Sequence, residues 1–335
     1  MKTSTILSVL SASFLAATGI TAQTFTYDFN SQWNNDWQTY YNQSGGVSPN
    51  TTLNYSKTAE GRSGGASGNY FGGNVQSLGY QGSLTSVFSG TSAQKTLAAV
   101  NDRIRLQGSF SAFSSQTGFT GGSSEVGQVG LLGSPALSNN TAGSTLKNGN
   151  SVYLGFIERS WTGQNGVAPF PGSAEVEIGI FVGGTLTESF GTFTVSDYGA
   201  RAGSQVWSQW FEYDLVFEHL GDGSLGYKAG INTVSFYDAD LNSAPDPTEG
   251  TPVSLGVFEG AIASLGGITV ADADKLFVSY GTYIAPDGLA SVTGYTFDHL
   301  PGGDIHDGII TIVPEPSAAL LLGFAGSLMV LRRRR

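Results

Sequence analysis

Two carboxylates with a spacing suited to acid–base chemistry occur in the stretch AEVEIGIF, where one residue separates Glu175 from Glu177. Successive side chains of a β-strand alternate between its two faces, so residues two apart point to the same side. Cleavage of a glycosidic bond uses two carboxyl groups in this way, one as general acid and the other as base or nucleophile. The spacing permits such a pair. An ordinary solvent-facing strand carries two acids as readily, and we favour that interpretation.

Aromatic residues gather in the polar stretch NSQWNNDWQTYYNQS, which contains Trp33, Trp37, Tyr40 and Tyr41. Exposed aromatic rings stack on the apolar faces of sugars, while a polar tip or polar neighbours bond the hydroxyls. The stretch is therefore a candidate glycan-binding site, with burial in the core as the alternative for any single ring.

Acidic residues in turn-like stretches are candidate metal ligands. Asp238 and Asp240 lie in YDADLNSAPDP, and Asp28 would meet Asp298 if the first strand paired with a late one. Ca²⁺ binds oxygen ligands from loop carboxylates and carbonyls. No stretch matches an EF-hand loop, and Asp is also an ordinary turn residue. A structural Ca²⁺ is therefore a hypothesis, and no motif requires a cofactor.

Other routes to catalysis have little support in the composition. The chain has no Cys, which excludes disulfides, thiolate metal sites and Cys nucleophiles, and it has three His. No Gly-x-Ser-x-Gly stretch lies between a strand and a helix, where a serine nucleophile would need it. We therefore expect a protein that is not an enzyme.

The charge of the chain argues against nucleic acid as a partner. The chain has 15 basic and 26 acidic residues. Without Lys2 and the four terminal arginines 10 basic residues remain, and without Glu315 there remain 25 acidic ones, so residues 23–312 carry a net charge near −15. Binding to a phosphate backbone needs clustered positive charge.

Composition and periodicity predict an all-β fold with two antiparallel sheets packed as a sandwich over residues 23–312. Gly is abundant, at 48 residues, and charged residues are few, at 12%. The segment WFEYDLVFEHL alternates, with Phe211, Tyr213, Leu215 and Phe217 on one face. We predict a hairpin turn at residues 221–224, long loops at 42–73 and 121–145, and a modest helix at 92–100. Further strands are predicted at 104–107, 152–157, 175–182, 190–195, 253–258, 276–280 and 292–297.

The two ends of the chain predict export. Residues 1–22 combine Lys2, an apolar run and small residues before a cleavage point after Ala22, as in a secretory signal peptide. Residues 317–331 are 15 uncharged residues. As a transmembrane helix they would be about 22 Å long, against a hydrocarbon core of roughly 30 Å. The Arg cluster that follows would stay on the cytoplasmic side.

Residues 313–335 resemble the PEP-CTERM sorting signal in the order of their features, namely a Pro-Glu-Pro motif, an apolar span and an Arg cluster. The matching residues are Pro314, Glu315 and Pro316 in the motif, and Arg332, Arg333, Arg334 and Arg335 as the cytoplasmic stop. The resemblance implies Sec export, transient anchoring in the inner membrane and recognition by an exosortase. It also implies a final place on the cell surface or outside the cell, in bacteria that form biofilms. A plain anchor that is never processed is the alternative.

In strand number, length and residue pattern the central domain resembles the concanavalin A-like jelly-roll sandwiches. This resemblance implies a role in glycan binding or glycan cleavage. We therefore expect an exported surface or matrix protein, non-catalytic, that binds glycan or exopolysaccharide or has a structural role. The alternative is a jelly-roll glycoside hydrolase or polysaccharide lyase that uses Glu175 and Glu177.

Overall fold

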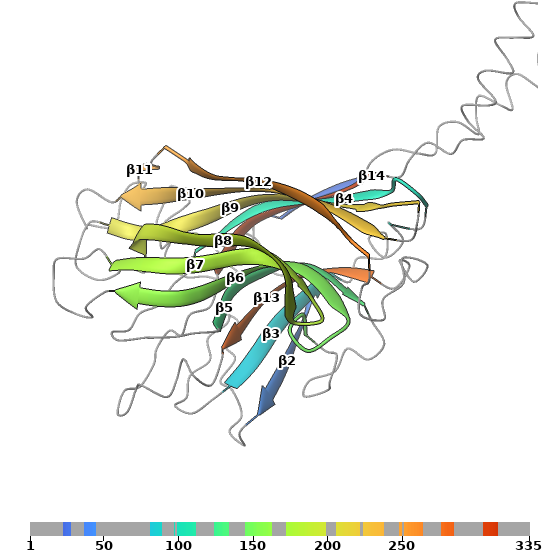
Figure 1. Cartoon of the computed structure of the whole chain (residues 1–335), viewed down its shortest axis with the longest axis horizontal. Helices are drawn as coiled ribbons and strands as arrows, with labels where there is room; N and C mark the ends of the chain where they lie inside the picture. Colours follow the sequence, from blue (N-terminus) through green and yellow to red (C-terminus); the bar gives the residue numbers. More distant parts are fainter. Residues whose placement is uncertain are drawn as a thin grey trace, which may run out of the picture.

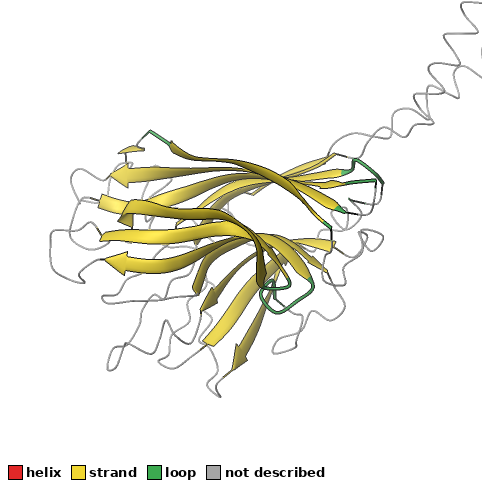
Figure 2. Cartoon of the chain, viewed as in Figure 1, coloured by secondary structure: helices red, strands yellow, loops and turns green. Residues whose placement is uncertain are grey.

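The chain forms β-strands throughout the part that this computed structural model describes (Figures 1 and 2). The described residues are 23–27, 37–44, 81–88, 97, 99–111, 124–133, 145–162, 172–198, 206–221, 224–237, 248–249, 251–263, 276–284 and 304–313. The strands form two seven-stranded antiparallel sheets that lie face to face. This confirms the predicted all-β, two-sheet antiparallel sandwich.

One sheet, which we call sheet 1, contains the first and the last strands of the described chain. Its order is β1-β14-β4-β9-β10-β11, and β12 also pairs with β10. The strands are β1 (Gln23–Tyr27), β4 (Arg103–Ser111), β9 (Val206–His219), β10 (Leu225–Tyr237), β11 (Thr248–Glu249), β12 (Val253–Ile262) and β14 (Asp304–Val313).

The other sheet, which we call sheet 2, has the order β2-β3-β13-β5-β6-β7-β8. Its strands are β2 (Trp37–Ser44), β3 (Gln81–Phe88), β5 (Ser124–Gly133), β6 (Ser151–Thr162), β7 (Gly172–Val182), β8 (Thr185–Tyr198) and β13 (Leu276–Ile284). Strands β5 to β8 follow one another along the sheet, whereas β13 enters between β3 and β5.

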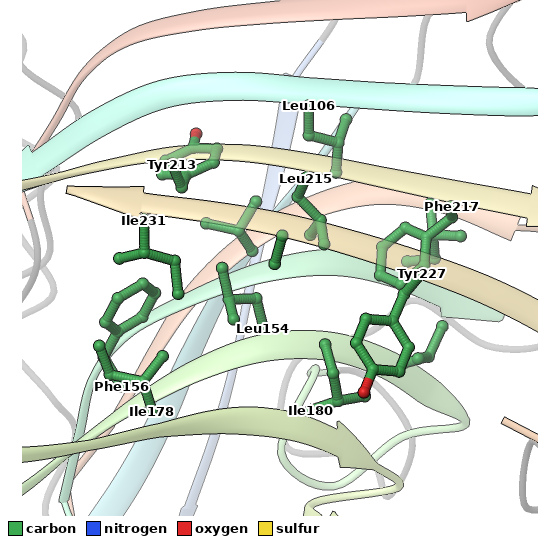
Figure 3. Close-up of a cluster of buried hydrophobic side chains, with 14 of the residues drawn as sticks. Leu106, Leu154, Phe156, Ile178, Ile180, Tyr213, Leu215, Phe217, Tyr227 and Ile231 are labelled. Atoms are coloured by element: carbon green, nitrogen blue, oxygen red, sulfur yellow. The ribbon is translucent and has the colours of Figure 1, made fainter. Parts of the chain in front are cut away.

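The hydrophobic core lies between the two sheets, and strand alternation supplies it. On β9 every second residue is buried, and these are the four apolar residues predicted to share a face: Phe211, Tyr213, Leu215 and Phe217. Figure 3 shows Leu106, Leu215 and Phe217 of sheet 1 across from Leu154, Ile178 and Ile180 of sheet 2. Burying each such side chain contributes about 1.5–3 kcal/mol, so this interface holds the sandwich together.

The predicted hairpin turn is confirmed, because β9 and β10 pair along their whole lengths on either side of it. The amide of Leu220 donates to the carbonyl of Ser224 at 2.9 Å and closes the turn.

The first strand pairs with the last strand of the described chain. β1 pairs with β14, with Gln23 opposite Ile312 and Tyr27 opposite Gly308. The stretch from Tyr295 to His299, which was expected to provide the late strand, lies outside the described residues.

Two predictions of irregular structure were wrong. Residues 121–145 were predicted as one loop, but β5 lies within them and is a buried strand of sheet 2. The predicted loop at 42–73 begins inside β2, which continues to Ser44. In the helix candidate 92–100, the described residues 97, 99 and 100 form bends and a turn. The intrinsic propensity of Gly-rich and Ser-rich stretches favours loops, but pairing with neighbouring strands can override that propensity.

The predicted signal peptide, the Pro-Glu-Pro motif, the apolar span and the Arg cluster lie outside the described residues. Within the described residues, no helix is long and apolar enough to cross a membrane.

Candidate functional site

Glu175 and Glu177 lie on β7, on the outer face of sheet 2. On this strand Val176 and Ile178 belong to the core between the sheets, so the residues that alternate with them point outward. Glu175 is exposed and Glu177 is partly buried. The prediction that the two share one face is therefore confirmed.

The surroundings of Glu177 do not suit a catalytic acid. Its Oε2 accepts a hydrogen bond from Nε of Arg159 at 2.8 Å, and its Oε1 accepts one from the hydroxyl of Ser189 at 2.7 Å. Burial acts to raise the pKa of Glu177, but the hydrogen bonds from Ser189 and Arg159 and the charge of Arg159 outweigh it. The net pKa is lowered, so this carboxyl stays ionised, whereas a glycosidase acid needs a raised pKa.

Three of the four aromatic candidates lie on one edge strand of sheet 2. Trp37, Tyr40 and Tyr41 are on β2, the edge strand, and Trp33 lies outside the described residues. Along the ladder, Tyr40 pairs with Thr85, Thr85 with Gly281, and Gly281 with Gln128. The position of Tyr40 is therefore in the same cross-strand row as Gln128 in the middle of the sheet.

The metal candidates Asp28, Asp298, Asp238 and Asp240 lie outside the described residues. Within the described residues, no three His, Cys, Asp or Glu side chains come together as a metal site would need.

A polar cluster that the sequence did not reveal lies beneath the outer face of sheet 2, around Glu125. Its Oε2 accepts hydrogen bonds from Nε2 of Gln128 at 2.7 Å and from the hydroxyl of Tyr153 at 2.8 Å. Its Oε1 contacts the ammonium of Lys147. Glu125, Gln128 and Tyr153 have exposed fractions of 0%, 1% and 0%, so the cluster is screened from bulk water.

A β-bulge brings Glu125 and Gln128 to the same face. Residues three apart on a regular strand point to opposite faces. The register of β5 against β6 shifts between Glu125 and Gly127, so that Glu125 lies opposite Ile157 and Gln128 opposite Gly155. A matching shift in β13 places Tyr283 opposite Glu125. The extra residue re-aims one side chain, as bulges near functional sites commonly do.

The ammonium of Lys147 has hydrogen-bond acceptors and aromatic rings around it. Besides Glu125, it donates to the carbonyl of Gly184 at 3.1 Å. It lies 4.7 Å from the ring centroid of Tyr283 and 5.7 Å from that of Phe181. The side chain of Lys147 is 21% exposed, so it marks the place where the cluster meets solvent.

Tyr153 is a hydrogen-bond donor that stays neutral. Burial raises its pKa well above the usual value, and the charge of Glu125 and the hydrogen bond to Glu125 add to the shift, against a smaller opposite effect of Gln128. Its ring stacks on that of Phe181, with centroids 5.0 Å apart and an interplanar angle of 7°. Two glycines leave space for these rings, since a Cβ on Gly155 would lie 2.6 Å from Phe181 and one on Gly130 would lie 2.5 Å from Cβ of Tyr153.

One acceptor in the cluster is left without a donor. Oε1 of Gln128 is buried, and no group of the described residues donates a hydrogen bond to it. The orientation of the amide is set by Glu125, because a carboxylate accepts from Nε2 and would repel Oε1. A buried acceptor of this kind is costly unless a water or a ligand supplies a donor. Oε1 of Gln128 is therefore the acceptor of this cluster that a bound water or a ligand would have to satisfy.

Comparisons with known proteins give likenesses of structure only. No family model matches the chain, and no curated protein matches it. Among solved structures, the chain is similar to lectin II from Ulex europaeus, with a TM-score of 0.39 and 11% identity over 87% of this chain and 99% of the lectin. It is similar to the T. cruzi calreticulin globular domain, with a TM-score of 0.32 and 13% identity over 93% of this chain and 99% of that domain. It is also similar to the alginate lyase Aly36B, with a TM-score of 0.32 and 13% identity over 82% of this chain and 96% of the lyase.

Proposed function

We propose that this chain is an exported protein of the cell surface or extracellular matrix, and that it binds glycan on the outer face of sheet 2 without cleaving it. The observation that carries the proposal is the buried Oε1 of Gln128, which has no donor among the described residues. A sugar hydroxyl supplies the missing donor, and its ring carbons supply an apolar face for neighbouring aromatic groups.

The surroundings of Gln128 support recognition rather than catalysis. Glu125 holds the amide in a fixed orientation, and Lys147 and Tyr153 hold Glu125. A site with locked polar groups orients a hydroxyl precisely and loses little freedom on binding. Glu177, one member of the predicted catalytic pair, is engaged by Arg159 and keeps a lowered pKa. We therefore do not propose the hydrolase or lyase reaction.

Export and sorting complete the proposal. Residues 1–22 act as a signal peptide for the Sec machinery, and residues 313–335 act as a PEP-CTERM sorting signal. Exosortase recognises Pro314, Glu315 and Pro316 while the apolar span holds the chain in the inner membrane. The sandwich is then delivered to the surface or the matrix, where exopolysaccharide is the available glycan.

Binding of the full chain to a glycan array, with and without calcium, tests the proposal. The variant Gln128→Leu removes the acceptor, and Gln107→Leu makes the same change on the outer face of sheet 1. We expect Gln128→Leu to weaken binding about tenfold, the value of one hydrogen bond to a fixed acceptor, and Gln107→Leu to leave it unchanged. Equal losses in the two variants would refute the proposed site. Absence of binding to every glycan would leave the structural role as the remaining function.

A further inference from the structure

We infer that the glycan bound on the outer face of sheet 2 is neutral, and that acidic polysaccharides are excluded from it. This inference rests on the proposed function and adds to it the chemical class of the ligand. It depends on how the described basic side chains are paired.

Each of the five basic side chains that the structure describes is in an ion pair with a carboxylate. On the outer side of sheet 1, Arg103 pairs with Glu218 at 3.0 Å, Lys228 pairs with Glu259 at 3.5 Å, and Arg105 pairs with Asp214. On the outer side of sheet 2, Lys147 pairs with Glu125 and Arg159 pairs with Glu177. A uronate or a sulfated sugar is bound most strongly by a cation that can turn to it, and on the described faces each described cation already pairs with a carboxylate of the chain.

Among the described basic groups, Lys147 is the one that contacts Glu125 together with Gln128, and its ion pair is buried on the carboxylate side. Its partner Glu125 is fully buried, so a ligand carboxylate that drew Lys147 away would leave a buried charge without its cation. Breaking a buried pair on one side is strongly unfavourable. A ligand carboxylate would also approach Glu125 itself. The cluster as a whole is electrically balanced, and it offers an incoming group a hydrogen-bond acceptor rather than a positive charge.

The negative electrostatic potential around the site also disfavours acidic ligands. Glu175 and Glu177 lie on the same outer face, and residues 23–312 carry a net charge near −15. A polyanion is therefore repelled during approach, most strongly at low salt. A neutral sugar meets no such barrier, and its hydroxyls can donate to Oε1 of Gln128.

The test uses the full chain and polymers of known charge. Dextran, laminarin and mannan serve as neutral probes, and alginate and polygalacturonate serve as acidic ones, each at low and high salt. We expect at least one neutral polymer to bind with an affinity that salt does not change, and the acidic polymers not to bind. Binding of an acidic polymer that weakens as salt rises would overturn neutrality but leave glycan binding intact. Failure of every polymer to bind would overturn both proposals.

A pair of charge variants tests the cause of the selectivity. Glu125→Gln keeps the shape of the side chain and frees Lys147, while Glu218→Gln makes the same charge change beside Arg103 on sheet 1. We expect Glu125→Gln to bind alginate measurably at low salt, where the wild type does not, because one charged hydrogen bond becomes available. Glu218→Gln should produce no such gain. Equal gains in both variants, or no gain in Glu125→Gln with its fold intact by circular dichroism, would overturn the inference.

Discussion

The ammonium of Lys147 contacts the fully buried carboxylate of Glu125, which lies 22 residues earlier in the chain. This contact fastens the turn at residues 145–150 onto the outer face of sheet 2. Leu146 of the same turn packs with Tyr153 and Phe181 in a small second core. The candidate site is therefore also a structural element, and substitutions in it change stability as well as binding.

The variant Lys147→Met is expected to lower the free energy of unfolding by about 3–5 kcal/mol, because Glu125 stays buried after its cation has been removed. Chemical denaturation followed by tryptophan fluorescence measures this change. Lys228→Met is the control, since its pair with Glu259 is 3.5 Å long and both side chains are mostly exposed. That substitution should cost less than about 1 kcal/mol. Similar effects of the two substitutions would mean that the buried pair has no special role.

The variant Gly155→Ala is expected to destabilise the fold by about 1–3 kcal/mol. Its new Cβ would lie 2.6 Å from the Phe181 ring, which stacks on Tyr153 and cannot move without disturbing the cluster. Gly230→Ala is the matched control on β10, because the nearest atoms to its Cβ would lie 3.9 Å away, in Asp214. Thermal unfolding of both variants decides the matter: a Gly155→Ala protein as stable as Gly230→Ala would contradict the tight packing.

Stability is expected to fall at alkaline pH because of buried tyrosines. Burial raises the pKa of Tyr280 to about 12, and the neighbouring Tyr213 acts against the shift to a smaller extent. A free tyrosine has a pKa of about 10. The folded value is the higher one, so the contribution of Tyr280 is complete below pH about 10 and is lost as the pH rises toward about 12.

The loss amounts to about 1.4 kcal/mol per pH unit for one such group. Urea denaturation measures this loss of stability when it is repeated between pH 9 and pH 12, at intervals of about half a pH unit. Tyr280→Phe should give a shallower decline above pH about 10 and no change of slope below it. An unchanged decline in the variant would assign the alkaline loss to other groups.

Replacement of Pro314, Glu315 and Pro316 by alanine is expected to leave the full-length chain in the membrane fraction. The reason is that an exosortase would no longer recognise the stretch before the apolar span. Immunoblotting of membrane, surface and medium fractions measures the outcome. Replacement of Ser317 by alanine, just after the motif, is the control and should be processed normally. Normal processing of the triple variant would show that Pro-Glu-Pro is not the sorting motif here.

Strand alternation made much of the sandwich predictable. In β9 the residues that alternate with Phe211, Tyr213 and Leu215 are charged or half-exposed, so the sequence itself distinguishes the buried face. The same reasoning correctly placed Glu175 and Glu177 on one face of β7. It could not show that Arg159 reaches Glu177, because that contact depends on the pairing of β6 with β7.

The cluster around Glu125 was not predictable for two physical reasons. Strand β5 has the sequence SEVGQVGLLG, and its glycines suggested a loop. At one of them, Gly130, no larger residue would fit, because Tyr153 lies against it. Only the folded sheet reveals this contact. The bulge between Glu125 and Gly127 then breaks the period-two pattern, so that Glu125 and Gln128 would have been assigned to opposite faces. The spacing of Val129 and Leu131, which are both buried, was the remaining signal of a strand.

The pairing of β1 with β14 makes sheet 1 depend on both ends of the described chain. β14 lies between β1 and β4, so it is an inner strand of sheet 1 although it is the last strand of the described chain. Among the described strands, β14 is the one that pairs with β1, and β14 and β9 are the two partners of β4. A chain that emerges from its N-terminus therefore completes sheet 1 only when residues 304–313 are available, so the last described strand closes the sheet that the first one begins.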